Sequence, residues 1–340
     1  MQKMATQTRF DTLCIGSVTM DFLARPSVSE SIDINSFDKV QHFLCLNFAS
    51  KTQLAQIEYE PGGSAANSAN VMSLLGSKVE LLAAVGKDDF GEMIVNDLHK
   101  RTIGSTYLAR VAGEKSAIGI SILSPGGEKS LLVYPGANGL LGPSDLPVEA
   151  VKECSSVFIT SLSSEKNYGL FARAVRLAKK HSKKIIFAPS ITMLRKFSRR
   201  LSRLHPHFDV CVMNYEEAMF YTKRTRMADL LRALPGKTRV ISKDKDGAYA
   251  LDNGVFYHCP APTCKVVDTT GAGDSFTGAL VFEYQRTGDI AKALAVGTAV
   301  AEIKLGHLGP RIDYSAEKMQ KLVAKNSRKF AARKVDPDRI

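Results

Sequence analysis

The 340-residue sequence has no run of about 18 consecutive apolar residues, so no segment has the length and character of a membrane-spanning helix. Residues 1–9 are polar and lack the hydrophobic region of a signal peptide. The six cysteines include no Cys-x-x-Cys pair and no histidine-paired spacing, which excludes the usual structural zinc motifs. We therefore expect a cytoplasmic protein without a membrane partner, whose cysteines are small buried side chains.

Acidic residues are missing from one long block of the chain. Residues 166–208 contain twelve Lys or Arg and no Asp or Glu, whereas the rest of the chain balances 34 basic against 34 acidic residues. Apolar residues recur at helical spacing in this block, which predicts two amphipathic surface helices. The basic residues are not interleaved with aromatic ones for base stacking, so we interpret the block as a solvated basic face and not as a nucleic-acid site.

The order of expected elements predicts the fold class. From residue 155 onward strands and helices alternate, which is typical of an α/β protein with a doubly wound, mainly parallel sheet flanked by helices. Strand-like runs of another kind lie at 40–48, 53–59, 106–111, 117–123 and 129–134. No internal repeat interrupts the chain, so we expect a single domain over residues 1–340.

The most informative motif is DTTGAGDSF at 268–276, between an expected strand at 264–267 and an expected helix from Phe276. Gly271 and Gly273 let successive N–H groups converge on a phosphate at the positive end of the helix dipole. Asp274 stands beside that phosphate, where a carboxylate could take the proton of an attacking hydroxyl. The alternative is a strand-to-helix turn with an Asp N-cap.

A second motif agrees with the first. Residues 60–70 read EPGGSAANSAN, and Leu75-Gly76 and VGKDDFG at 85–91 follow. In content and spacing the two motifs resemble the N-terminal and C-terminal signatures of the ribokinase or PfkB family of carbohydrate and nucleoside kinases. The resemblance extends over nearly the whole chain. It implies a ribokinase-like α/β domain with a small β-sheet lid over the substrate, formed here by about 22–60 and 106–134.

The resemblance also implies roles on the sugar side of the site. Asp274 is the implied catalytic base, and the implied anion hole consists of Gly271, Ala272 and Gly273. The residues implied to bind substrate hydroxyls are Asp21, Gly62, Gly63 and Asn67. Asp21 follows the expected strand 12–16. From the sequence alone Asp21 is equally a turn residue and Asn67 a residue of a first helical turn.

On the nucleotide side the resemblance implies ATP and Mg²⁺. The implied nucleotide-binding residues are Asn214, Ser242, Gly247 and Thr270. Glu217 is implied to hold Mg²⁺ through water, although NYEE at 214–217 is also the pattern of a capping box. Asp268 resembles the residue that shapes a monovalent-cation site, which would take K⁺. In SKDKDG at 242–247, Asp244 replaces the usual glycine and places an extra carboxylate near the ATP phosphates.

The expected function is transfer of the ATP γ-phosphoryl group to a hydroxymethyl of a small sugar, as in a ribokinase or fructokinase. A nucleoside (adenosine-type) kinase is the alternative, because aromatic residues of the lid segments could stack a base or simply form lid core. These residues are Phe37, Phe43, Phe48, Tyr59, Tyr107 and Tyr134. A third hypothesis is an inactive kinase fold that binds nucleic acid through 166–208. Because a lid exposes apolar strand faces and an edge, we also expect a homodimer through the lid.

Overall fold

The computed structural model describes residues 8–27, 30–36, 39–45, 48, 51–123 and 129–340. A nine-stranded sheet forms its centre, in the order β17-β16-β15-β14-β13-β12-β11-β1-β6. The strands are β1 (Phe10–Ile15), β6 (Val79–Leu82), β11 (Cys154–Ile159), β12 (Lys184–Phe187), β13 (Val210–Asn214), β14 (Thr238–Lys243), β15 (Gly247–Asp252), β16 (Val255–Cys259) and β17 (Arg333–Lys334). Within this order, the neighbouring strands from β6 through β1, β11, β12 and β13 to β14 pair in parallel. Strands β15, β16 and β17 pair antiparallel with the strand before them in the chain. This confirms the predicted mainly parallel sheet.

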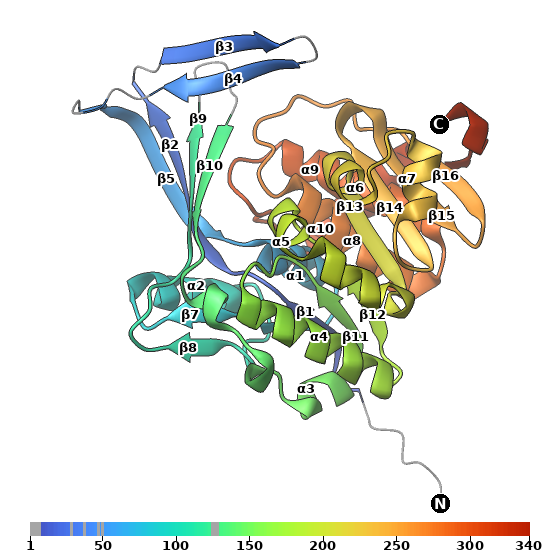
Figure 1. Ribbon diagram of the computed structural model, residues 1–340, viewed down its shortest axis with the longest axis horizontal. Coiled ribbons are helices and arrows are strands. Elements are labelled where there is room, and N and C mark those ends of the chain that lie inside the picture. Colours follow the sequence, from blue (N-terminus) through green and yellow to red (C-terminus); the bar gives the residue numbers. More distant parts are fainter. Residues whose placement is uncertain (1–7, 28–29, 37–38, 46–47, 49–50, 124–128) are drawn as a thin grey trace, which may run out of the picture.

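Helices cover both faces of this sheet (Figure 1). They are α1 (Ser64–Leu75), α2 (Asp89–Lys100), α3 (Val148–Lys152), α4 (Glu165–Lys180), α5 (Ile191–Leu201), α6 (Tyr215–Thr222), α7 (Met227–Ala233), α8 (Ala272–Thr287), α9 (Ile290–Leu305) and α10 (Ala316–Asn326). Alternate strand residues point to opposite faces. In β1, Leu13 and Ile15 pack in the core with α3 to α7, whereas Cys14 packs in a second core with α1, α2, α8 and α9.

A second, four-stranded sheet, called here the small sheet, has the order β10-β9-β2-β5. Its strands are β2 (Thr19–Pro26), β5 (Leu54–Gly62), β9 (Ile118–Leu123) and β10 (Lys129–Tyr134). Figure 1 shows it rising from the edge of the main layers, with the hairpin of β3 (Glu30–Ser36) and β4 (Lys39–Cys45) at its far end. Residues 117–123 and 129–134, expected as strands, therefore share one sheet with Asp21.

Three sequence-based expectations differ from the structure. Residues 106–111 are not part of the small sheet, because β8 (Ala109–Val111) pairs with β7 (Ala84–Gly86). Residues 264–267 form no strand. Asp21 does not follow the first core strand directly: it lies inside β2, opposite Glu60 of β5.

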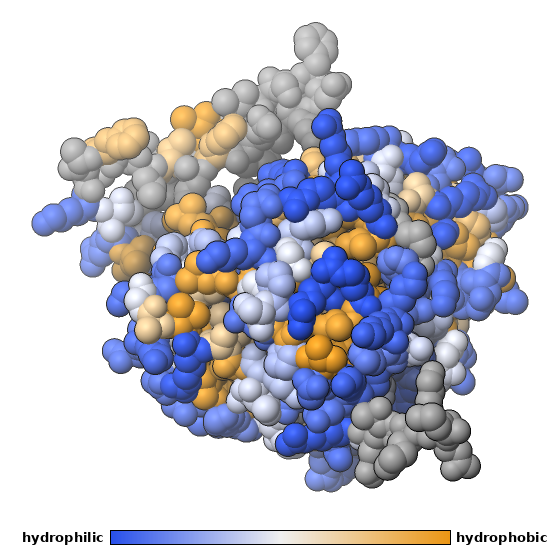
Figure 2. Space-filling model, turned by 60° about the horizontal axis from the view of Figure 1, so that its bottom comes forward, coloured by the Kyte–Doolittle hydropathy of each residue, from blue (hydrophilic) through white to orange (hydrophobic). Residues whose placement is uncertain are grey.

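The described surface is mixed. On the face shown in Figure 2, hydrophilic residues predominate and hydrophobic residues gather in patches between them. The basic block behaves as expected, since Arg195, Lys196 and Arg199 of α5 are exposed while Leu194 and Phe197 are buried. Among the described residues no helix combines the length and apolar character needed to cross a membrane.

Candidate active site

The DTTGAGDSF motif forms the turn into α8. Gly271 adopts φ 73°, the left-handed region, and a side chain there would strike the backbone of Pro310. Gly273 is open, because an added Cβ would meet no atom within 4 Å. The Ala272 N–H donates to Thr269 O at 3.2 Å within the turn. The first turn of α8 therefore presents a bare backbone surface at the positive end of the helix, as an anion requires.

Asp274 follows in the first turn of α8 and is held from α1. Asn67 Nδ2 donates to Asp274 Oδ2 at 2.9 Å, and Ser68 Oγ donates to the Asp274 carbonyl at 3.0 Å. Burial raises the pKa of Asp274 to about 7, against the opposing effect of the Asn67 hydrogen bond. The negative charge of Asp21 raises the pKa further, and the positive charge of Arg311 lowers it. A carboxyl group with this pKa can exchange a proton near neutral pH.

Asp21 reaches the same region from the small sheet. Its carboxylate lies between Gly62 and Gly119, where any Cβ would overlap its oxygens. Burial raises the pKa of Asp21, and a hydrogen bond from the Gly63 N–H acts in the opposite direction. Gly63 itself has φ 95° and precedes α1. The predicted residues Asp21, Gly62 and Gly63 are thus in contact. Asp21 occupies the space of a side chain at position 62, whereas the positive φ and the backbone of Ser17 and Val18 require glycine at position 63.

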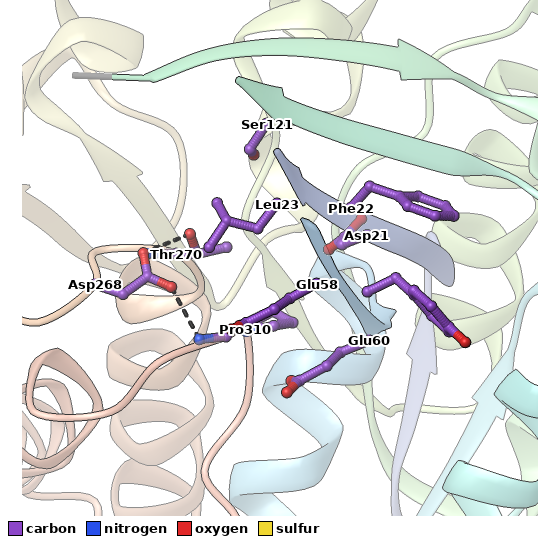
Figure 3. A pocket seen from close by; sticks show the side chains of 11 residues that line it. Asp21, Phe22, Leu23, Glu58, Glu60, Ser121, Asp268, Thr270 and Pro310 are labelled. Atoms are coloured by element: carbon purple, nitrogen blue, oxygen red, sulfur yellow. Dashed lines mark hydrogen bonds between the residues drawn. The ribbon is translucent and has the colours of Figure 1, made fainter. Parts of the chain in front are cut away.

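A small cavity of about 20 Å³ separates the small sheet from the 268–270 turn and the 309–310 loop (Figure 3). It is lined by Asp21, Phe22, Leu23, Glu58, Tyr59, Glu60, Ser121, Asp268, Thr270, Gly309 and Pro310. Figure 3 shows Glu58 pointing toward Asp268 and Pro310, and Phe22 pointing the other way. A volume of this size holds about one water molecule, so the cavity has to widen before a sugar ring can enter.

A larger cavity of about 150 Å³ lies on the nucleotide side. Its lining includes Asn214, Glu217, Ser242, Gly273 and Asp274. Hydroxyl groups of Ser64, Ser68, Thr160, Ser161, Ser190 and Thr277 complete the polar part of that lining. Residues that were predicted from three separate motifs therefore meet in one cavity, with Asp274 among them.

Asn214 and Glu217 form the capping box of α6. Asn214 Oδ1 accepts from the Glu217 N–H at 2.8 Å, and Glu217 Oε2 accepts from the Asn214 N–H at 2.9 Å. Burial raises the pKa of Glu217 to about 7, while the hydrogen bonds from the backbone of Asn214 and Ile191 oppose the shift. In the described part of the chain no group of three or more His, Cys, Asp or Glu side chains could hold a metal ion. This donor set fits Mg²⁺ held mainly by phosphates and water, with Glu217 beyond that water.

Asp268 organises the turn before the anion-binding surface. Its Oδ1 accepts from the Thr270 N–H at 2.8 Å and from Thr270 Oγ1 at 2.7 Å, and its Oδ2 accepts from the Gly309 N–H at 3.0 Å. The fully buried Lys304 donates to His307 O at 2.9 Å. Burial lowers the pKa of Lys304, and the negative charge of Asp268 opposes this shift. A fixed positive charge of the chain thus already acts on Asp268.

The segment 242–247 adapts to its unusual aspartate. Asp244 takes a positive φ of 33° and is exposed to solvent. Lys243 and Asp246 form an ion pair at 2.8 Å beside it. Gly247, predicted to bind nucleotide, has φ 87° and packs against the backbone of Cys259, so its glycine is explained by the turn. Of the two predicted residues in this segment, Ser242 alone lines the larger cavity.

The aromatic residues proposed for base stacking do not converge on Asp21. Tyr59 pairs with Phe22 across β5 and β2, and Phe22, next to Asp21 in the strand, points to the opposite face. Tyr134 lies in the same outward-facing set, and Tyr107 lies outside the small sheet against Phe10. Phe43 and Phe48 are exposed, and Phe37 lies outside the described residues.

Comparisons with known proteins place the chain in a family. Residues 14–317 match the family described as pfkB family carbohydrate kinase. A deoxyribokinase of Salmonella typhi is 26% identical over 264 residues, 74% of this chain and 84% of that protein.

Solved structures share the fold. An adenosine kinase from Sinorhizobium meliloti has a TM-score of 0.78 at 20% identity, over 92% of this chain and 99% of that one. An E. coli protein assigned as a ribokinase II, in complex with ATP and Mg²⁺, has a TM-score of 0.74 at 19% identity, over 93% of this chain and 99% of that one. The fold is ribokinase-like, and the chain belongs to the pfkB family of carbohydrate kinases.

Several charged residues of the site had no signal in the sequence. Arg311 and Lys304 are buried cations next to the predicted residues, and Glu58 lines the small cavity. Lys129 of β10 donates to Thr270 Oγ1 at 2.8 Å and so joins the small sheet to the motif turn. Lys304 and Arg311 belong to no recognised spacing. The alternation of β5 was the one available clue, because Glu58 and Glu60 share a face.

Proposed function

We propose that this protein is an ATP-dependent kinase that transfers the γ-phosphoryl group to a hydroxymethyl of a small, uncharged sugar. The observation that carries the proposal is Asp274, a half-buried carboxyl with a pKa near neutrality at the start of α8. It shares one cavity with Asn214 and Glu217 and acts electrostatically on Asp21 of the other. Membership of the family and the ATP and Mg²⁺ found with a structural relative support ATP as donor.

The proposed reaction uses the residues in sequence. Asp21 accepts hydrogen bonds from ring hydroxyls, and the close glycines 62 and 63 let the ring approach the backbone. Ionised Asp274 takes the proton of the hydroxymethyl group. At the same time the hydroxymethyl oxygen bonds to the γ-phosphorus, and the bond between that phosphorus and the ADP oxygen breaks. The N–H groups at the start of α8 stabilise the charge in transit, which requires the Ala272 N–H to leave Thr269 O if it takes part. Bound Mg²⁺ would supply charge neutralisation between the phosphates, near Glu217.

The charge of the sugar pocket supports a neutral substrate. Asp21, Glu58, Glu60 and Asp268 all line the small cavity. Such a group of carboxylates attracts hydroxyl donors and repels sugar phosphates and sugar acids. The outward orientation of Tyr59 and Tyr134 favours a free sugar over a nucleoside, because neither ring faces Asp21, where it could stack on a base.

The small sheet is proposed to act as a lid. Lys129 ties it to Thr270, and the cavity beneath it is too small for a sugar, so the sheet has to open for entry and close for reaction. A homodimer through its outward apolar face and a cytoplasmic location stay predictions. The inactive-scaffold hypothesis is disfavoured by the intact setting of Asp274.

A substrate panel tests the proposal. Purified protein is incubated with ATP and Mg²⁺ and with pentoses, hexoses, sugar phosphates or nucleosides, and ADP release and the phosphorylated product are measured. We expect a neutral sugar to give the highest kcat/KM and Asp274→Asn to lower its turnover about 10²- to 10⁴-fold. A nucleoside as best substrate would replace the sugar by the alternative. Absence of acceptor-dependent ADP release across the panel would contradict kinase function.

A further inference from the structure

The loop between α9 and α10 carries an arginine into the interior. The Arg311 side chain is 1% exposed. Its Nε donates to Asn67 Oδ1 at 3.1 Å, one terminal nitrogen donates to Gly62 O at 3.1 Å, and the other pairs with Asp97 of α2. A buried guanidinium is costly unless its donors and its charge are matched, and here both are. Its partners are two residues of the predicted sugar site and a carboxylate.

These contacts fix the amide of Asn67 in one orientation. Its oxygen faces the Arg311 donor, so its nitrogen faces Asp274 and donates to the carboxylate. In the flipped amide an N–H would face the guanidinium and an oxygen would face the carboxylate, and both contacts would be repulsive. Asn67, expected to bind substrate, therefore has its oxygen and one N–H engaged within the protein. Its principal contact is with the base.

We propose that Arg311 is the positioning residue of the catalytic base: through Asn67 it orients Asp274, and through the Gly62 carbonyl it fixes the adjoining sugar pocket, with Asp97 as its counter-ion. The inference rests on the proposed kinase function. Asp97, Arg311, Asn67 and Asp274 form successive contacts, and through them Arg311 contributes to catalysis without touching the reacting atoms.

The charges around Asp274 predict in which direction each substitution shifts its pKa. The charged groups that act on Asp274 are Asp21 from β2, Glu217 from α6 and Arg311 from its loop. Arg311 in turn faces Asp97 of α2, Arg101 directly after that helix, and Asp21 and Glu60 from the small sheet. Removal of the Arg311 charge disfavours ionised Asp274, and neutralisation of Asp97 favours it. The two changes should therefore shift the acidic limb of the kcat profile in opposite directions.

The experiment compares Arg311→Met, Arg311→Lys and Asp97→Asn with wild type, using kcat and KM over pH and the thermal midpoint of each protein. In R311M we expect kcat to fall about 10- to 100-fold and the acidic limb to move up by about one pH unit. In D97N the limb should move down. R311K keeps the charge but not the planar fork, so kcat should fall while the limb stays near its wild-type pH.

The control is Arg286→Met, which breaks the ion pair of Arg286 with the buried Glu283 of α8, on the same helix as Asp274. It should lower the thermal midpoint without moving the limb, as a merely structural residue would. If R311M does not fold, D97N and R311K decide. Limbs unchanged in D97N, or full kcat in R311K, would overturn the positioning role. An active wild type with unshifted variants refutes this inference alone, whereas a wild type inactive on the whole panel refutes the proposed function.

Discussion

We expect Asp274→Asn to lower the catalytic rate of this protein and to raise its stability. The substitution keeps the shape of the side chain and removes its charge and basicity. Loss of a general base lowers kcat by about 10² to 10⁴, whereas ATP binding, which depends on other residues of the larger cavity, should change little. In the wild type the pKa of about 7 also predicts a kcat that falls as the pH drops below neutrality, because protonated Asp274 cannot accept the substrate proton.

The same pKa sets the effect on stability. The ordinary pKa is 3.8, so the folded protein binds the Asp274 proton more tightly than the unfolded chain does. The free energy of unfolding therefore decreases as the pH rises through the window between the two values. Above that window the charge on this half-buried carboxylate costs about 2–4 kcal/mol. D274N carries no such charge. It should be more stable than wild type by up to this amount near about pH 8, and the gain should shrink toward about pH 4.

The assay is urea unfolding of both proteins without ligand at several pH values, beside steady-state kinetics. Asp338→Asn is the matched control, because the Asp338 side chain is 85% exposed and its neutralisation should change neither quantity appreciably. Wild-type turnover in D274N would remove Asp274 from its role. A D274N protein no more stable than wild type near about pH 8 would refute the argument from the buried charge.

Four further predictions follow from the site and the small sheet. Asp21→Ala should raise the sugar KM at least about tenfold and leave the KM for ATP near wild type, because ring hydroxyls lose their acceptor; an unchanged sugar KM moves the pocket elsewhere. Exchange of K⁺ for Na⁺ should change kcat less than about twofold, because Lys304 already places a positive charge near Asp268; strong K⁺ activation contradicts this. Hydrogen exchange in β2, β5 and β9 should slow when sugar and an unreactive ATP analogue bind together, and equal exchange in both states argues against a lid. Solution scattering should give a dimer that Leu132→Asp dissociates, since Leu132 is 56% exposed; a monomeric wild type rules out the dimer.

Local chemistry made part of this site predictable from the sequence. The left-handed Gly271, the turn closed by Asp268 and the α6 capping box each depend on residues within a few positions, so short motifs encode them. The alternation of strands and helices likewise encoded the central sheet, because each crossover is a local unit. Asp274 could be predicted as a site residue because the glycines that form its turn are adjacent to it in the chain, although its hydrogen-bond partners Asn67 and Ser68 are not.

Long-range pairing made the rest unpredictable. Arg311 lies 244 residues from Asn67 and 214 from Asp97, and a lone arginine in a loop carries no periodicity. The expected strand at 264–267 failed for a related reason. Val266 and Val267 have strong strand propensity but remain 52% and 54% exposed, and β17 already occupies the edge beside β16. Strand propensity has an effect only where an edge and a face are available.

Asp21 belongs to the small sheet and Asp274 to α8 of the main body. If the small sheet closes as proposed, a bound sugar would connect two parts that move relative to one another. The apparent affinity for sugar then equals the intrinsic affinity of the closed form multiplied by the fraction of sugar-free molecules that are closed. A substitution in the strands that connect the sheet to α1, far from any hydroxyl, would weaken sugar binding as effectively as a lost hydrogen bond. The affinity for all sugars can thus be adjusted together through the energy of closure, whereas the selectivity among them stays with the residues that touch the ring.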